Sequence, residues 1–121
     1  MFKDEFMNFL KVKVLEVSKD TVKVEGEVKR EYVNVHGTAH GSYIFSLMDF
    51  AFSILSNLDK RRVAVSISVD YLKPAYEGDK LIGEASVVER TRRFLFCEIK
   101  VKKHDKTIAY GKAISYSPDL K

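Results

Sequence analysis

The stretch SYIFSLMDFAFSILSN, residues 42–57, decides the fold of this chain of 121 residues. It contains neither Pro nor Gly, and Ser42 is a predicted helix N-cap. Apolar side chains recur at helical spacing and extend around most of the circumference of the predicted helix. Because such a helix belongs in a protein interior, we expect it to be buried. Its narrow polar stripe consists of Ser46, Asp49, Ser53 and Ser56.

Segments with a period of two surround this helix. Upstream, residues 2–10 show helical spacing, and alternating valines within 12–28 predict two antiparallel strands joined near Lys19 and Asp20. Downstream, residues 63–71, 81–88, 94–101 and 108–116 predict four strands, although Val88 breaks the alternation of the second. Strands this closely connected form an antiparallel sheet. The sequence therefore predicts an α+β fold, with the sheet wrapped around one long central helix.

Length and composition predict one folded domain, residues 1–121, with 45% hydrophobic and 12% aromatic residues. Cys97 is the only cysteine, which excludes an internal disulfide and favours a reducing compartment. Acidic residues near the N-terminus and an apolar stretch too short to span a bilayer predict a cytoplasmic protein that binds no membrane. The net charge of +4 favours anionic partners without choosing among them.

Asp49 is the most informative residue, because it is the only formally charged side chain between Glu31 and Asp59. Desolvation makes a buried carboxylate costly unless it has partners. One interpretation is a structural Asp bonded to serines or backbone. The other is a general base or nucleophile held in a cleft that contains little water.

A run with two glycines, NVHGTAHG at residues 34–41, leads into the predicted helix. Free backbone N–H groups at a helix start can bind a developing oxyanion, and a glycine there leaves room for a ligand. The alternative is a turn glycine followed by a cap, with His40 as a buried core histidine.

The spacing of Gly41 and Asp49 adds a geometric constraint. The two residues lie roughly 12 Å apart along one helix axis, which is too far for both to contact one carbonyl carbon. They can meet if two helices run antiparallel across a twofold axis. If both are catalytic, we expect a composite site in a homodimer.

The motifs HGTAHG at 36–41 and FSLMDFAF at 45–52 resemble those of the hotdog-fold acyl-CoA thioesterases of the phenylacetic acid degradation type. The similarity continues through SISVDYLKP at 66–74 and the pair Gly78-Asp79. The resemblance implies that Asp49 activates or delivers the attacking oxygen and that the Gly41 amide holds the thioester oxygen. Asn34 and His40 would orient the carbonyl or the water.

Family members usually carry a second glycine where this chain has Ser42, and this departure bears on the acyl-chain preference. Ser53 lies one turn beyond Asp49 and could hold the water, or it could bond its own helix backbone. No separate cofactor is expected, because coenzyme A is part of the substrate. Its phosphates suit basic side chains, and guanidinium groups in particular. The candidates for substrate binding are therefore Lys73, Arg90, Arg92 and Arg93.

Other chemistries fit the sequence less well. His36 and His40 have no acidic or cysteine cluster to complete a metal site. Cys97 lies in a strand pattern that is typical of packing, and a nucleic-acid binder would need interleaved basic and aromatic motifs.

The leading prediction is an enzyme that hydrolyses an aryl-acetyl- or medium-chain acyl-CoA. The alternatives are a hotdog enoyl-CoA hydratase or dehydratase with His40 as base, and a non-catalytic acyl-CoA-binding regulatory domain. The sequence leaves open the acyl group, the pathway, a homodimer against a homotetramer, and whether Asp49 is nucleophile or base.

Overall fold

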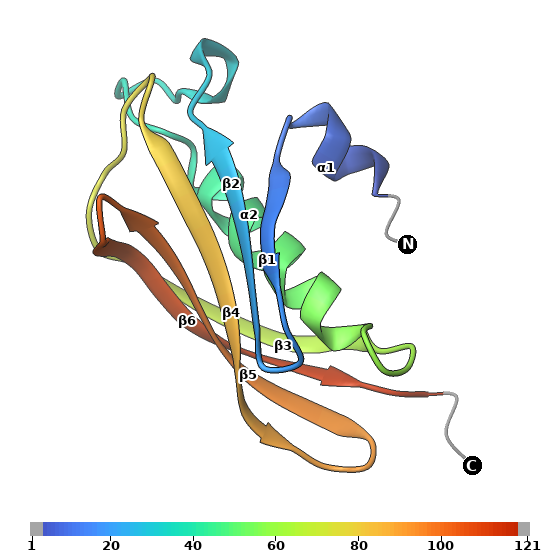
Figure 1. Ribbon diagram of the computed structural model, residues 1–121. Helices are drawn as coiled ribbons and strands as arrows, with labels where there is room; N and C mark the ends of the chain where they lie inside the picture. The colour runs from blue at the N-terminus through green and yellow to red at the C-terminus, as the bar shows by residue number, and fades with distance from the viewer. Residues whose placement is uncertain (1–3, 119–121) are drawn as a thin grey trace.

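The protein, a computed structural model that describes residues 4–118, consists of a six-stranded sheet and one long helix that lies against it (Figure 1). Neighbouring strands are antiparallel throughout, in the order β1-β2-β4-β5-β6-β3, so the predicted α+β architecture is confirmed. Phe2 and the two ends of the predicted domain lie outside the described residues. The elements are α1 (Glu5–Phe9), β1 (Lys13–Val17), β2 (Thr21–Glu27), η1 (Arg30–Tyr32), α2 (Gly41–Ser56), β3 (Val63–Tyr71), β4 (Lys80–Arg90), β5 (Phe94–Lys103) and β6 (Lys106–Tyr116).

The core lies between α2 and the inner face of the sheet. Side chains alternate between buried and half-buried along β2 and β5, as the period of two requires. On α2, Leu47, Met48 and Ala51 are completely buried against β2, β4 and β5. The burial of the central helix is therefore confirmed, and it follows from the apolar character of nearly its whole circumference.

Gly83 lets α2 rest directly on β4. A Cβ added at this position would lie 2.6 Å from the carbonyl oxygen of Leu47 and 2.8 Å from its carbonyl carbon. Both atoms belong to the helix backbone, which cannot move away without displacing the packed side chains on either side of Leu47. The missing side chain of Gly83 thus sets the separation between helix and sheet.

We expect Gly83→Ala to lower the free energy of unfolding by about 1–3 kcal/mol, the usual cost of overpacking a core. Urea unfolding followed by circular dichroism measures this change. Gly41→Ala is the matched control, since its Cβ would meet the ring of Tyr71 at 3.4 Å, an ordinary contact. Equal stability of the two variants would show that the helix is free to move off the sheet.

Irregularities in two strands explain what the alternation could not predict. A bulge between Val87 and Glu89 leaves Val88 66% exposed, which accounts for the broken alternation in β4. A second bulge, between Ala64 and Ser66, interrupts β3. Strand β3 forms one edge of the sheet, and its side chains are exposed or half-buried along its whole length.

The start of α2 differs from the prediction by two residues. His40, and not Ser42, is the N-cap, and Gly41 is the first helical residue. The His40 side chain makes no capping hydrogen bond, and its backbone N–H donates to the carbonyl of Tyr32. The 3₁₀ turn that carries Tyr32 therefore determines where the helix begins.

None of the helices within residues 4–118 combines the length and the apolar character needed to cross a membrane.

Candidate active site

Asp49 lies in the middle of α2, on the side that faces away from the sheet, and is half-buried. The predicted polar stripe of the helix is only partly correct. Ser53 is exposed near Asp49, as is Ser42 at the start of the helix. Ser46 and Ser56, however, are buried, and Ser46 donates its hydroxyl to the Ser42 carbonyl at 2.8 Å.

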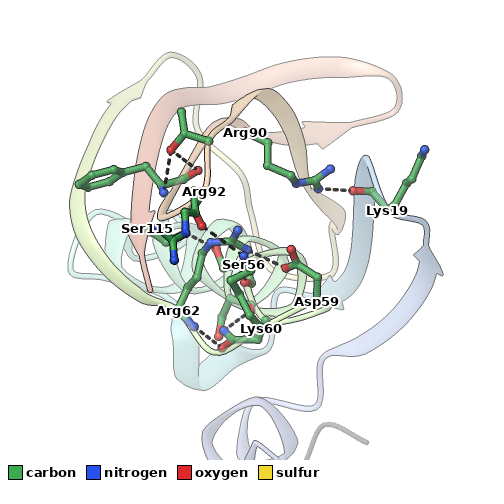
Figure 2. Close-up of polar contacts among 12 residues, drawn as sticks. Lys19, Ser56, Asp59, Lys60, Arg62, Arg90, Arg92 and Ser115 are labelled. Atoms are coloured by element: carbon green, nitrogen blue, oxygen red, sulfur yellow. Dashed lines mark hydrogen bonds and ion pairs between the residues drawn. The ribbon is translucent and has the colours of Figure 1, made fainter. Parts of the chain in front are cut away.

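Ser56 belongs to a structural cluster at the C-terminal end of α2 (Figure 2). Its hydroxyl accepts a hydrogen bond from Ser115 on β6 at 2.8 Å, and its carbonyl accepts one from Arg62. The same Arg62 nitrogen lies 2.7 Å from the Asp59 carboxylate. This buried guanidinium satisfies a carbonyl at the helix end, where a positive charge is favourable. Ser56 thus anchors the helix and takes no part in the site around Asp49.

The carboxylate of Asp49 has no hydrogen-bonding or ion-pair partner within residues 4–118. Burial raises the pKa of Asp49 above its ordinary value of 3.8, and the negative charge of Asp4 raises it further. Within this protomer, Asp49 is therefore not a structural residue bonded to neighbouring serines. An unpaired acid with a raised pKa in a half-buried position is typical of a catalytic carboxylate.

The loop before α2 is ordered by Asn34. The Asn34 Oδ1 atom accepts backbone hydrogen bonds from His36 at 2.9 Å and Thr38 at 3.1 Å, while Nδ2 donates to the Thr38 hydroxyl at 3.0 Å. Gly37 has a φ of +82°, a left-handed conformation that favours glycine. Within this protomer Asn34 therefore shapes the loop that leads to Gly41. Its predicted role toward the substrate stays a prediction.

Gly41 presents a free amide at the start of α2. Neither its N–H nor that of Ser42 has an acceptor among the described residues, as the first turn of a helix leads one to expect. The Tyr71 hydroxyl donates to the Gly41 carbonyl at 3.1 Å and fixes the helix start to the end of β3. His40 is exposed, so its interpretation as a buried core histidine is wrong.

Two cavities lie beside α2, one at each half of the helix. One, of about 300 Å³, is lined by Gly41, Ile44, Tyr71 and Lys73. The other, of about 780 Å³, lies between α1, β1 and the second half of α2, and Ser53 lines it. Gly41 and Lys73 thus share one cavity, whereas Ser53 lies by the other.

The three candidate arginines lie at the far end of α2 from Gly41. Arg90 donates to the carbonyl of Lys19 at 2.8 Å and ties the end of β4 to the β1–β2 turn (Figure 2). Lys60, just beyond α2, donates to the Arg92 carbonyl at 3.2 Å, and Arg93 is half-buried in the same turn. One protomer therefore does not bring these arginines together with Lys73.

Cys97 faces the core from β5 and is 2% exposed. Burial raises the pKa of its thiol to about 12, although the nearby Arg90 and Arg62 act in the opposite direction. A thiol that is buried and protonated packs as a small apolar side chain. Among residues 4–118, no three His, Cys, Asp or Glu side chains gather around a point that could hold a metal ion.

Two residues near the site escaped the sequence-based predictions. The ring of Tyr71 supports the start of α2, and no local pattern links a strand residue to a helix 30 positions earlier. The charge of Asp4, the N-cap of α1, acts on Asp49. An Asp three residues before a buried Met7 is a helix N-cap signal, which predicts where α1 begins but not what it faces.

A long central helix against a six-stranded antiparallel sheet is an architecture that this chain shares with solved structures of similar sequence. Residues 36–110 match the thioesterase superfamily model. The chain belongs to this superfamily, and its fold is the hotdog fold. The prediction of an enzyme that hydrolyses thioesters is thereby confirmed.

Three relatives illustrate the similarity. A putative esterase from Archaeoglobus fulgidus is 38% identical over 93% of this chain and 75% of its own length. The acyl-coenzyme A thioesterase PaaI of Escherichia coli is 31% identical over 74% of this chain and 65% of its own length. A mutant of the phenylacetic acid degradation protein PaaI from Thermus thermophilus superposes with a TM-score of 0.92, at 32% identity, covering 94% of this chain and 99% of that one.

Proposed function

We propose that this protein hydrolyses acyl-CoA thioesters, with Asp49 as the catalytic carboxylate. The observation that carries the proposal is the state of Asp49: half-buried, without a partner among the described residues, and with a raised pKa. The name of the Escherichia coli relative supports coenzyme A as the leaving group. The basic net charge of +4 suits a substrate that carries several phosphate charges.

The reaction needs a base, an oxygen nucleophile and a site for the oxyanion. As a general base, Asp49 takes a proton from water while the water oxygen attacks the thioester carbon. The Gly41 N–H donates to the carbonyl oxygen as it becomes negative. The C–S bond then breaks, and the proton on Asp49 passes to the departing thiolate, which leaves free coenzyme A and a carboxylic acid.

A site made by two protomers is part of the proposal. Gly41 and Asp49 lie at opposite ends of a helical span of roughly 12 Å, so one chain cannot apply both to the same carbonyl. Strand β3 supports pairing of two chains, because it is an edge strand with exposed Val63 and Val65. Natural proteins seldom leave such an edge uncovered. We propose a homodimer in which Gly41 of one chain faces Asp49 of the other, and two dimers could pair into a tetramer.

We propose an aryl-acetyl or medium-chain acyl group. The cavity beside Ser53, of about 780 Å³, is large enough for such a group, and Met7, Val12 and Ile54 form the apolar part of its otherwise polar lining. The name of the Thermus relative, a phenylacetic acid degradation protein, supports the aryl-acetyl choice. Release of free thiol across a panel of acyl-CoAs, with phenylacetyl-CoA and octanoyl-CoA as the leading members, tests both the reaction and the acyl group. Absence of thiol release across the whole panel would remove the hydrolase proposal.

We expect Arg90, Arg92 and Arg93 to contribute to the binding of coenzyme A phosphates from the partner protomer. In an antiparallel arrangement of two helices, the end of α2 that carries these arginines lies toward Gly41 of the other chain. Replacing all three with Gln should raise the Michaelis constant by about tenfold, since charge-assisted hydrogen bonds are lost, with little change in turnover. Steady-state kinetics measure both constants, and an unchanged Michaelis constant would refute the phosphate role.

The control for this triple variant is Arg90→Gln alone. Arg90 already donates to the Lys19 carbonyl, so its single replacement measures how much of the effect comes from loosening the β1–β2 turn. A single variant that reproduces the whole rise in the Michaelis constant and also lowers Tm would assign the effect to structure and not to phosphate binding.

A further inference from the structure

An aromatic contact joins α1 to α2 at the residue that follows Asp49. The ring of Phe6 meets the ring of Phe50 edge-on, with 5.7 Å between centroids and 70° between the planes. Met7 and Leu10, each 8% exposed, fix the short helix to the core. The residue next to Asp49 in the sequence is therefore a direct contact of α1.

The residues of α1 and its cap bracket Asp49 on both sides. Phe6 lines a small cavity together with Ser46, which lies one turn before Asp49. Asp4 lines the larger cavity together with Ser53, which lies one turn after Asp49. Asp4 therefore lies on the same side of α2 as Ser53, the residue one turn after Asp49.

Asp4 is held in place by its own helix. As the N-cap of α1, its Oδ1 atom accepts a hydrogen bond from the Met7 N–H at 3.0 Å, and its carbonyl accepts one from Asn8 at 3.0 Å. This arrangement keeps a negative charge at a fixed position.

Other charged side chains and one histidine also line the two cavities, and all are exposed: Glu31 and His40 beside Ser46, and Glu5 and Lys13 beside Ser53. Lys13 lies 3.7 Å from Glu25, with which it forms an ion pair. Helix α2 carries no other charged residue, and β2, β4 and β5 present apolar side chains to it. Among the charges on the described residues, that of Asp4 raises the pKa of Asp49.

We infer that Asp4 is a positioning residue that sets the range of pH over which Asp49 works as a base. The inference rests on the proposed function, in which Asp49 must be ionised to act. Two like charges in a partly desolvated space disfavour double ionisation. The pKa of Asp49 is raised first by its burial and then by the charge of Asp4, which agrees with this geometry. A carboxylate with a pKa closer to neutral is also a stronger base.

Asp4→Asn separates the charge of Asp4 from its structural role, because Asn caps a helix about as well as Asp. Glu5→Gln is the matched control, since it removes one negative charge from the same cavity and the same helix. In each full-length variant, ¹³C NMR of the aspartate carboxyl carbons follows the titration of Asp49 directly, with Asp49→Asn used to assign its signal. This measurement needs no substrate.

We expect the Asp49 titration to move to lower pH in Asp4→Asn and to move less in Glu5→Gln. On the acidic limb of its pH profile, kcat/KM for phenylacetyl-CoA should rise by about threefold in Asp4→Asn at a fixed pH, because more Asp49 is ionised. An unchanged Asp49 titration in Asp4→Asn, or an equal movement in Glu5→Gln, would overturn the inference. Full activity of Asp49→Asn would instead overturn the proposed function, and the NMR result would stand apart from it.

Discussion

Asp49→Asn is expected to lower the turnover of acyl-CoA by at least about a hundredfold, the usual effect of losing a positioned base. The amide keeps the size of the carboxylate but can neither accept the proton of water nor attack the thioester. Because no hydrogen bond or ion pair of the described residues involves the Asp49 carboxylate, the substitution removes chemistry without removing a structural contact. Steady-state kinetics with the fastest acyl-CoA of the panel measure the loss.

The same variant should be at least as stable as the original protein at neutral pH. The pKa of Asp49 is raised above 3.8 in the folded state, so the folded protein binds this proton more readily than the unfolded chain. As the pH rises from the ordinary carboxyl value through the raised one, ionisation of Asp49 therefore lowers the free energy of unfolding. Asn removes this cost, and thermal unfolding at pH 7 should show an equal or higher Tm.

Asp20→Asn is the control for Asp49→Asn. Asp20 is exposed at the β1–β2 turn, so the variant loses the same charge far from α2 and should keep full activity. Full activity in Asp49→Asn would assign catalysis to another residue. A loss of activity together with a clear fall in Tm would show that Asp49 is needed for folding.

Two inactive variants are expected to restore each other when their chains are mixed. A homodimer with composite sites has two of them, each with Gly41 from one chain and Asp49 from the other. If Asp49→Asn and Gly41→Val chains are unfolded together and refolded, each heterodimer contains one site with both native residues. Random pairing makes half of the dimers heterodimeric, and each of these has one of two sites intact, so activity should recover to about a quarter of the original.

The mixing experiment distinguishes a shared site from a site within one chain. If Gly41 and Asp49 of the same chain formed the site, every chain in the mixture would carry one defect, and the mixture would stay inactive. Each variant refolded alone gives the background. A mixture of Asp49→Asn chains with Asp49→Ala chains is the matched negative control, because no pairing of those chains restores the carboxylate.

Most of the fold could be predicted because each element has a clear hydrophobic period. The absence of Pro and Gly between residues 42 and 57 and the apolar circumference of that stretch define α2. Alternation defines the strands, and even the irregularity at Val88 proved to be a bulge. The start of α2 was less predictable, because it depends on a hydrogen bond between His40 and Tyr32. These two residues belong to segments that a loop separates.

The candidate site was predictable where charge and burial conflict, and not where it depends on tertiary contacts. Asp49 could be singled out because a lone acid in an apolar helix is costly. The contribution of Asp4 could not be predicted, since it requires knowing that α1 contacts α2 beside Asp49. Which serines of the polar stripe are buried likewise depends on tertiary contacts, since Ser56 is bonded by Ser115 on β6. Helical periodicity alone assigns Ser46, Ser53 and Ser56 to one surface.

The buried thiol of Cys97 has a practical consequence for every kinetic experiment described above. Reagents that report coenzyme A colorimetrically react with thiolates, and a thiol that is 2% exposed with a pKa of about 12 supplies almost none. Each colour change in a continuous assay therefore counts one product molecule, without a correction for the enzyme itself. For the same reason, the native protein should tolerate storage in air without a reducing agent.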